Sequence, residues 1–183
     1  MDLSREKAWN ILNQYVQEKT LLNHCVAVEA AMRAYAAKYG EDVEYWGAVG
    51  LLHDVDFEKY PKEHPEHAGT ILKPYGYTEQ FITDIRSHAR DWVAERSLLQ
   101  KVLLGVDELT GFIIACALVR PDKSLANLQV KSVMKKMKDK AFARAVNRDM
   151  LVQGAEMLKI DLKEHIEFVT EALAGCPILS LPS

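Results

Sequence analysis

The chain has 183 residues, of which 49% are hydrophobic and 27% are charged. This length and composition fit a soluble globular protein with a full core. No apolar run reaches the roughly 18 residues that cross a bilayer, and the polar N-terminus does not resemble a secretory signal. The three cysteines are widely spaced and form no CxxC pair. We therefore expect free thiols, no membrane partner and a reducing, cytoplasmic setting.

The net charge of −3 hides an uneven distribution. Nine basic and two acidic residues lie between Arg120 and Arg148, so this segment carries +7 and the rest of the chain −10. Such a segment favours an anionic partner, although a solvated helix face explains it equally well. An extended nucleic acid usually needs a larger basic surface with stacking aromatic side chains, which are almost absent here. A small anion is therefore the favoured partner.

Apolar residues follow helical spacing along the whole chain, and no alternating strand pattern is convincing. Ser4 can cap the first helix, Thr20 can open the second, and Gly40 can end it. Asp42 begins a third helix that ends at the pair His53–Asp54. We expect helices over residues 5–16, 20–39, 42–53, 64–74, 79–88, 97–118, 128–137, 142–158 and 162–174. This pattern predicts one all-α domain over residues 1–183, built as a bundle of seven to nine helices.

Polar residues with metal-binding side chains interrupt three of these apolar helices. They are His24, the pair His53–Asp54 and Asp107. A carboxylate is expensive to bury unless it is paired, hydrogen-bonded or bound to a metal ion. Histidine with carboxylate from separate rigid elements suits a hydrolytic metal site of Mn, Fe, Zn, Ni or Mg. For any one of these residues alone, a satisfied polar group in the core is an equally good interpretation.

In this order, and on helices, these residues resemble the HD superfamily of metal-dependent phosphohydrolases. The resemblance covers roughly residues 20–120, and the segment Val49-Gly50-Leu51-Leu52-His53-Asp54 is similar to the helix-end motif of that family. It implies an HD-like metal-binding core about 20–120, followed by a helical extension with a basic face about 121–175. It also implies that His24, His53, Asp54 and Asp107 bind a first metal ion.

Some members of the family bind a second ion, with the motif aspartate as the bridge. The segments around His64 and His88 resemble those that supply two additional histidine ligands. His67 lies three residues after His64 and is the weaker candidate. One or two divalent ions are both compatible with this pattern, and two are favoured, with Asp54 bridging them.

The chain departs from the binuclear relatives directly after the motif. They often have a glycine and a lysine where this chain has Asp56 and Phe57, so a phosphate contact from that lysine would be missing. We expect the basic segment to supply this phosphate contact instead and to bind the substrate through Lys131, Lys135 and Arg144. A solvated face or a subunit contact, which would allow a homodimer, is at least as good an explanation of each.

The resemblance implies a hydrolase that cleaves a phosphate ester or anhydride by attack of a metal-bound hydroxide. Its substrate would be a nucleotide or another small phosphorylated compound, and the enzyme would be a phosphomonoesterase or a phosphodiesterase. Two alternatives stay open at this point. One is a di-iron oxygenase with an HD-like fold, and the other is a non-catalytic regulatory module that binds metal.

Overall fold

A computed structural model describes residues 2–89 and 92–177 of the chain. Over these ranges the chain forms nine α-helices, one short 3-10 helix and no strand, which confirms the all-α prediction. None of the helices in this part of the chain is long and apolar enough to cross a membrane. In order they are α1 (Arg5–Tyr15), α2 (Lys19–Tyr39), α3 (Val43–Leu52), α4 (Ala68–Leu72), the 3-10 helix η1 (Lys73–Tyr75), α5 (Glu79–Arg86), α6 (Leu98–Leu118), α7 (Val130–Met137), α8 (Arg148–Leu158) and α9 (Leu162–Ala174).

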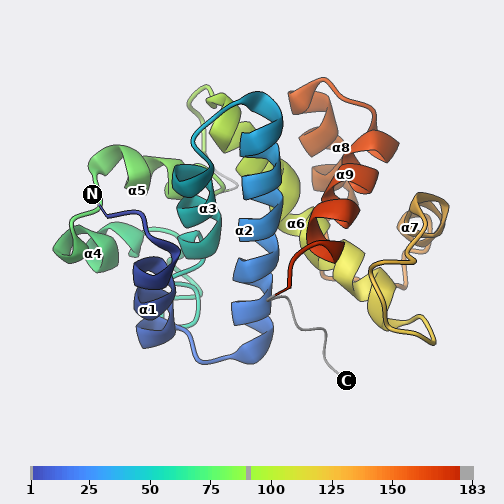
Figure 1. Cartoon of the computed structure of the whole chain (residues 1–183), viewed down its shortest axis with the longest axis horizontal. Helices are drawn as coiled ribbons and strands as arrows, with labels where there is room; N and C mark the ends of the chain where they lie inside the picture. The colour runs from blue at the N-terminus through green and yellow to red at the C-terminus, as the bar shows by residue number, and fades with distance from the viewer. Residues whose placement is uncertain (1, 90–91, 178–183) are drawn as a thin grey trace.

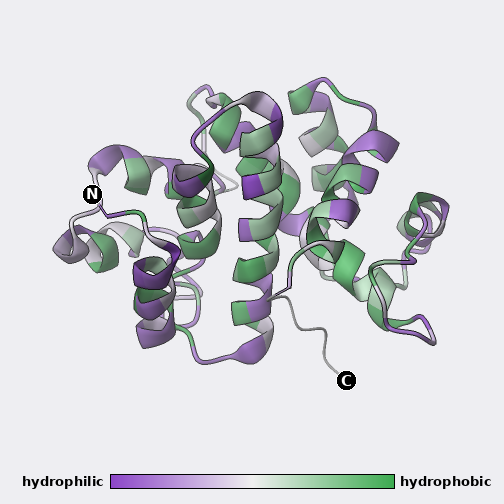
Figure 2. Ribbon diagram, viewed as in Figure 1, coloured by the Kyte–Doolittle hydropathy of each residue, from purple (hydrophilic) through white to green (hydrophobic). Residues whose placement is uncertain are grey.

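Helix α2 runs through the middle of the molecule (Figure 1). On one side it packs against α3, and on the other against α6 and α9. Its side chains Val28, Met32 and Tyr35 follow the three-four spacing and are fully buried. The hydrophobic residues of α2 and α3 meet along this interface (Figure 2). The two 21-residue helices α2 and α6 therefore form a rigid frame, to which the shorter helices attach.

Side-chain caps fix several helix boundaries. The carboxylate of Glu18 accepts hydrogen bonds from the amides of Thr20 and Leu21, so α2 begins just before Thr20, the residue that we expected to open it. Asp42 caps α3 as predicted, by accepting from the amide of Tyr45. Gly40 ends α2 in the left-handed conformation that glycine adopts without strain.

Two predicted helix starts are wrong, and in each case a side chain takes over backbone groups. The helix expected from His64 begins only at Ala68, because the carboxylate of Asp56 accepts the backbone amide of His67 and the ring proton of His64. The helix expected from residue 142 begins only at Arg148. The guanidinium of Arg148 donates to the carbonyls of residues 142, 143 and 146, which holds that segment in turns.

Glycine allows two pairs of helices to approach closely. A Cβ atom on Gly50 of α3 would lie 3.0 Å from the Cα of Glu29 in α2. A Cβ atom on Gly154 of α8 would lie 2.7 Å from the Cα of Gly105 in α6, a distance that real Cβ atoms essentially never show. Substitution of Gly154 therefore requires the backbones of α6 and α8 to separate.

We expect Gly154→Ala to destabilise the protein by about 1–3 kcal/mol, the usual cost of forcing extra volume into a packed interior. Gly111→Ala is the matched control, because a Cβ atom there meets nothing within 4 Å. It removes a helical glycine without a clash, so it should stabilise α6 by roughly 0.5–1 kcal/mol. Chemical denaturation of both variants measures the two free energies of unfolding. Equal effects would contradict the close approach of α6 and α8.

Candidate metal centre

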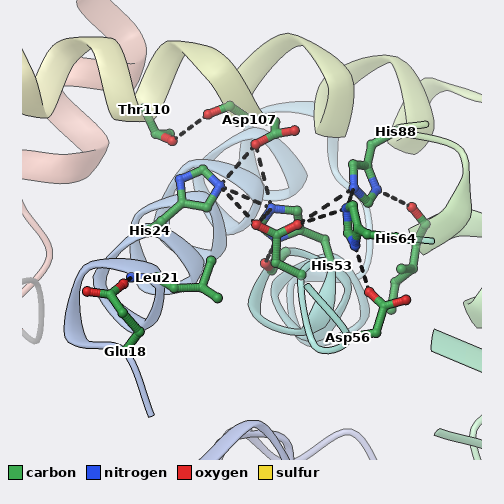
Figure 3. Close-up of polar contacts among 12 residues, drawn as sticks. Glu18, Leu21, His24, His53, Asp56, His64, His88, Asp107 and Thr110 are labelled. Carbon is green, nitrogen blue, oxygen red and sulfur yellow. Dashed lines mark hydrogen bonds and ion pairs between the residues drawn. The ribbon is translucent and has the colours of Figure 1, made fainter. Parts of the chain in front are cut away.

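Six histidine and aspartate side chains from distant parts of the sequence converge on one centre (Figure 3). They form two groups of three, and within each group the ligand atoms lie within 4.8 Å of one another. The first group is His24, His53 and Asp107, and the second is Asp54, His64 and His88.

The first group lies between the long helices of the frame. His24 comes from α2, His53 directly follows α3, and Asp107 comes from α6. The Nε2 atom of His24 lies 3.2 Å from Nε2 of His53 and 3.0 Å from Oδ1 of Asp107. The packing of α2 against α3 and α6 therefore sets the spacing of these three ligand atoms.

The second group depends on the irregular segments at the ends of short helices. His64 lies in the turns between α3 and α4, and His88 follows the end of α5. The Nε2 atoms of these two histidines are 2.8 Å apart. The Oδ1 atom of Asp54 lies 3.2 Å from Nε2 of His64 and 3.7 Å from Nε2 of His88.

The carboxylate of Asp54 divides its two oxygens between the groups. Its Oδ2 atom lies 3.6 Å from Nε2 of His24 and 3.4 Å from Nε2 of His53. Its Oδ1 atom faces His64 and His88 instead. One side chain thus contacts both groups, which is the arrangement that a bridging carboxylate needs.

Hydrogen bonds at Nδ1 leave the Nε2 atoms of three histidines available as ligands. The Nδ1 atom of His53 lies 2.8 Å from the carbonyl of Gly50, that of His64 lies 2.6 Å from Oδ1 of Asp56, and that of His88 faces the carbonyl of Ile85. A neutral ring that donates from Nδ1 keeps a lone pair on Nε2. Three such lone pairs and the carboxylates converge, and this donor set fits divalent cations.

The carboxylates give the centre a strong preference for positive charge. Burial alone would lower the pKa of His53, but the carboxylates of Asp54 and Asp107 outweigh it and raise that pKa to about 9. Burial likewise opposes charge on Asp107, yet hydrogen bonds from His24 and His53 hold its pKa well below the usual range. Burial and the neighbouring His53 lower the pKa of His88.

A pocket of about 520 Å³ opens onto the centre, within the usual size range of small-molecule sites. Ligand residues of both groups reach it, and α8 contributes one side chain from the C-terminal helices. Its lining is Asp54, Phe57, Pro61, His64, Pro65, His88, Ala89, Asp107, Glu108 and Met150.

The basic residues that the sequence suggested for substrate binding do not line this pocket. Lys131 and Lys135 line a separate pocket of about 560 Å³ beside α7 and α9, together with Lys138 and Lys163. Arg144 is exposed in the turns between α7 and α8. The geometry therefore does not bring the proposed phosphate contacts to the metal centre.

His67 also lies outside both groups. Its Nε2 atom is 2.8 Å from a carboxylate oxygen of Glu63, and its ring stacks on Tyr60.

The positioning contact of Asp56 and the pocket residue Met150 were not predicted from the sequence. Asp56 could have been suspected, because it is an acidic residue two positions after Asp54, whereas nothing in the sequence pointed to Met150.

The family comparison agrees with this geometry. The family model of the HD domain matches residues 21–111, a range that includes all six side chains of the two groups. The chain is an HD-domain protein. Members of this family are generally metal-dependent hydrolases, which places the His/Asp centre in a known chemical context.

Similarity to curated proteins is more distant. A 3-ketoacyl-CoA thiolase of Acinetobacter baylyi is 22% identical over 202 residues, which cover 96% of this HD-domain protein and 51% of the thiolase. The thiolase of Acinetobacter baumannii is 24% identical over 182 residues, covering 82% of this chain and 46% of that protein. The chain thus spans about half the length of the curated relatives that it matches. No solved structure matched it.

Proposed function

We propose that this HD-domain protein is a phosphohydrolase that holds two divalent ions and cleaves a small phosphate ester or anhydride. His24, His53 and Asp107 hold the first ion, His64 and His88 hold the second, and Asp54 bridges them. The proposal rests on the position of the Asp54 carboxylate between the two groups. Its Oδ2 atom faces the first group, and its Oδ1 atom faces the second.

Bound divalent ions lower the pKa of coordinated water towards 7 and polarise phosphoryl oxygens. The chain supplies the positioning for this chemistry. Asp56 fixes the ring of His64 through its Nδ1 atom, and the carbonyls of Gly50 and Ile85 fix the rings of His53 and His88. The pocket beside the six side chains gives room for the ester, with the reacting phosphate next to Asp54.

A thiolase activity, as in the name of the relatives, has less support in this chain. A cysteine nucleophile needs a lowered thiol pKa and access to its substrate. Cys25 and Cys116 are both buried, and burial raises the pKa of each thiol, that of Cys116 to about 11. None of the three cysteines, Cys176 included, is among the residues that line the pocket at the metal centre.

Metal analysis of variants tests the two-ion proposal. We expect about two ions per chain in the wild type, about one in His88→Ala, and close to none in Asp54→Ala, because only Asp54 contacts both groups. His67→Ala is the matched control, since this histidine bonds to Glu63 outside both groups. It should keep the wild-type metal content.

The measurement is metal per chain by elemental analysis, followed by hydrolysis of a panel of phosphate esters. Equal metal content in the wild type and in His88→Ala would contradict the second ion. Stoichiometric iron with oxygen uptake, and no ester hydrolysis, would instead favour the di-iron oxygenase. Protein without metal and without turnover would favour the regulatory module.

Asp56 should matter for the second ion alone. Its buried carboxylate accepts both the Nδ1 proton of His64 and the backbone amide of His67. Asp56→Asn keeps the shape of the side chain but removes its charge and one acceptor. We expect affinity for the second ion to fall about 10–100-fold, as is typical when such a supporting contact is lost. Calorimetric titration should show the first ion unchanged, and two unchanged affinities would refute this role.

A further inference from the structure

The residues that line the pocket at the metal centre are of two chemical kinds. The polar ones include the ligands Asp54, His64, His88 and Asp107. The apolar ones, which we call the apolar wall, are Phe57, Pro61, Pro65, Ala89 and Met150. They come from the turns after α3, from the segment after α5 and from α8.

Phe57 is the largest side chain of this wall. It is 41% exposed and lies at the start of an exposed segment, residues 57–63, that follows the buried Val55 and Asp56. Its ring meets the imidazole of His64 edge to face, with the centroids 5.2 Å apart. The apolar wall therefore begins directly beside a residue of the metal centre.

The described lining of the pocket offers no side-chain cation for a second phosphate. Its lining includes the carboxyl groups of Asp54, Asp107 and Glu108, and no lysine or arginine occurs among the lining residues that the structure describes. The clustered lysines of α7 line another pocket. A phosphate at the metal centre is matched by the ions, whereas the described lining offers a second phosphate apolar side chains and no lysine or arginine.

We propose that this pocket selects esters of a single phosphate whose alcohol carries a flat apolar ring, and that Phe57 determines this selectivity. The inference rests on the proposed phosphohydrolase function. In the reaction, the oxygen of water bonds to phosphorus, the bond between phosphorus and the ester oxygen breaks, and a proton of the water ends on the released alcohol. No further reactant is needed.

The test compares phenyl phosphate with glycerol phosphate and with phenyl diphosphate on the metal-loaded protein. We expect kcat/KM for phenyl phosphate to exceed the other two by about tenfold or more, within the range that one apolar group contributes to selectivity. Phe57→Ala should reduce the preference over glycerol phosphate about tenfold. Phe57→Lys should raise the relative use of phenyl diphosphate about tenfold, because it places a cation on the wall.

Val119→Lys is the matched control, because Val119 is also an exposed apolar residue but lines a third pocket, near the end of α6. It should leave all three ratios unchanged. Binding supplies a second measurement that needs no turnover. Phenylphosphonate should bind the metal-loaded wild type about tenfold more tightly than methylphosphonate, and Phe57→Ala should lose most of that difference.

The outcomes separate this inference from the function on which it rests. Hydrolysis of all three esters at similar rates, with unchanged ratios in the Phe57 variants, would overturn the selectivity and leave the phosphohydrolase proposal intact. Absence of hydrolysis of every ester by the metal-loaded wild type would overturn both. Equal binding of the two phosphonates would also refute the role of Phe57.

Discussion

The carboxylate of Asp54 is the constraint on which the rest of the centre depends. It is buried and lies against four imidazole rings, one from α2 and three from the segments that follow α3 and α5. Burying a carboxylate costs several kcal/mol unless positive charge or hydrogen bonds compensate for it. Because the rings of His53, His64 and His88 donate from Nδ1 to other acceptors, their neutral forms present only lone pairs towards this centre. Cations bound at Asp54 would satisfy both the carboxylate and the lone pairs.

The frame of helices explains how such a cluster keeps its geometry. Gly50 lets α3 lie against the backbone of α2, which brings the end of α3 with His53 and Asp54 towards His24. Gly154 does the same for α8 against α6, and α8 carries Met150 into the pocket. The C-terminal helices therefore contribute to the site, although the six candidate ligands all lie within the matched HD range.

The sequence predicted the parts of this structure that depend on local pattern. Apolar spacing predicted the long helices, and Asp42 caps α3 as its position indicated, whereas Ser4 precedes α1 without a side-chain capping bond. The segment 53–67 could not be read in this way, because Asp56 organises it through contacts with His64 and His67 rather than through periodicity. Similarly, helical spacing showed that Lys131 and Lys135 share a face, but it could not show which pocket that face adjoins.

The separation of the lysines from the metal centre has a consequence for how a phosphate would be held. Three lysines of the segment with a charge of +7 line a separate pocket, while the described lining of the site offers carboxyl groups and apolar side chains. In the proposed function the ions thus neutralise the phosphate as well as promote its hydrolysis, since the described lining supplies no lysine or arginine. Binding of the phosphate and the chemical step then depend on the same two ions. Removing them should abolish affinity for a phosphonate along with turnover, whereas a site with its own arginine or lysine contacts would retain part of that affinity.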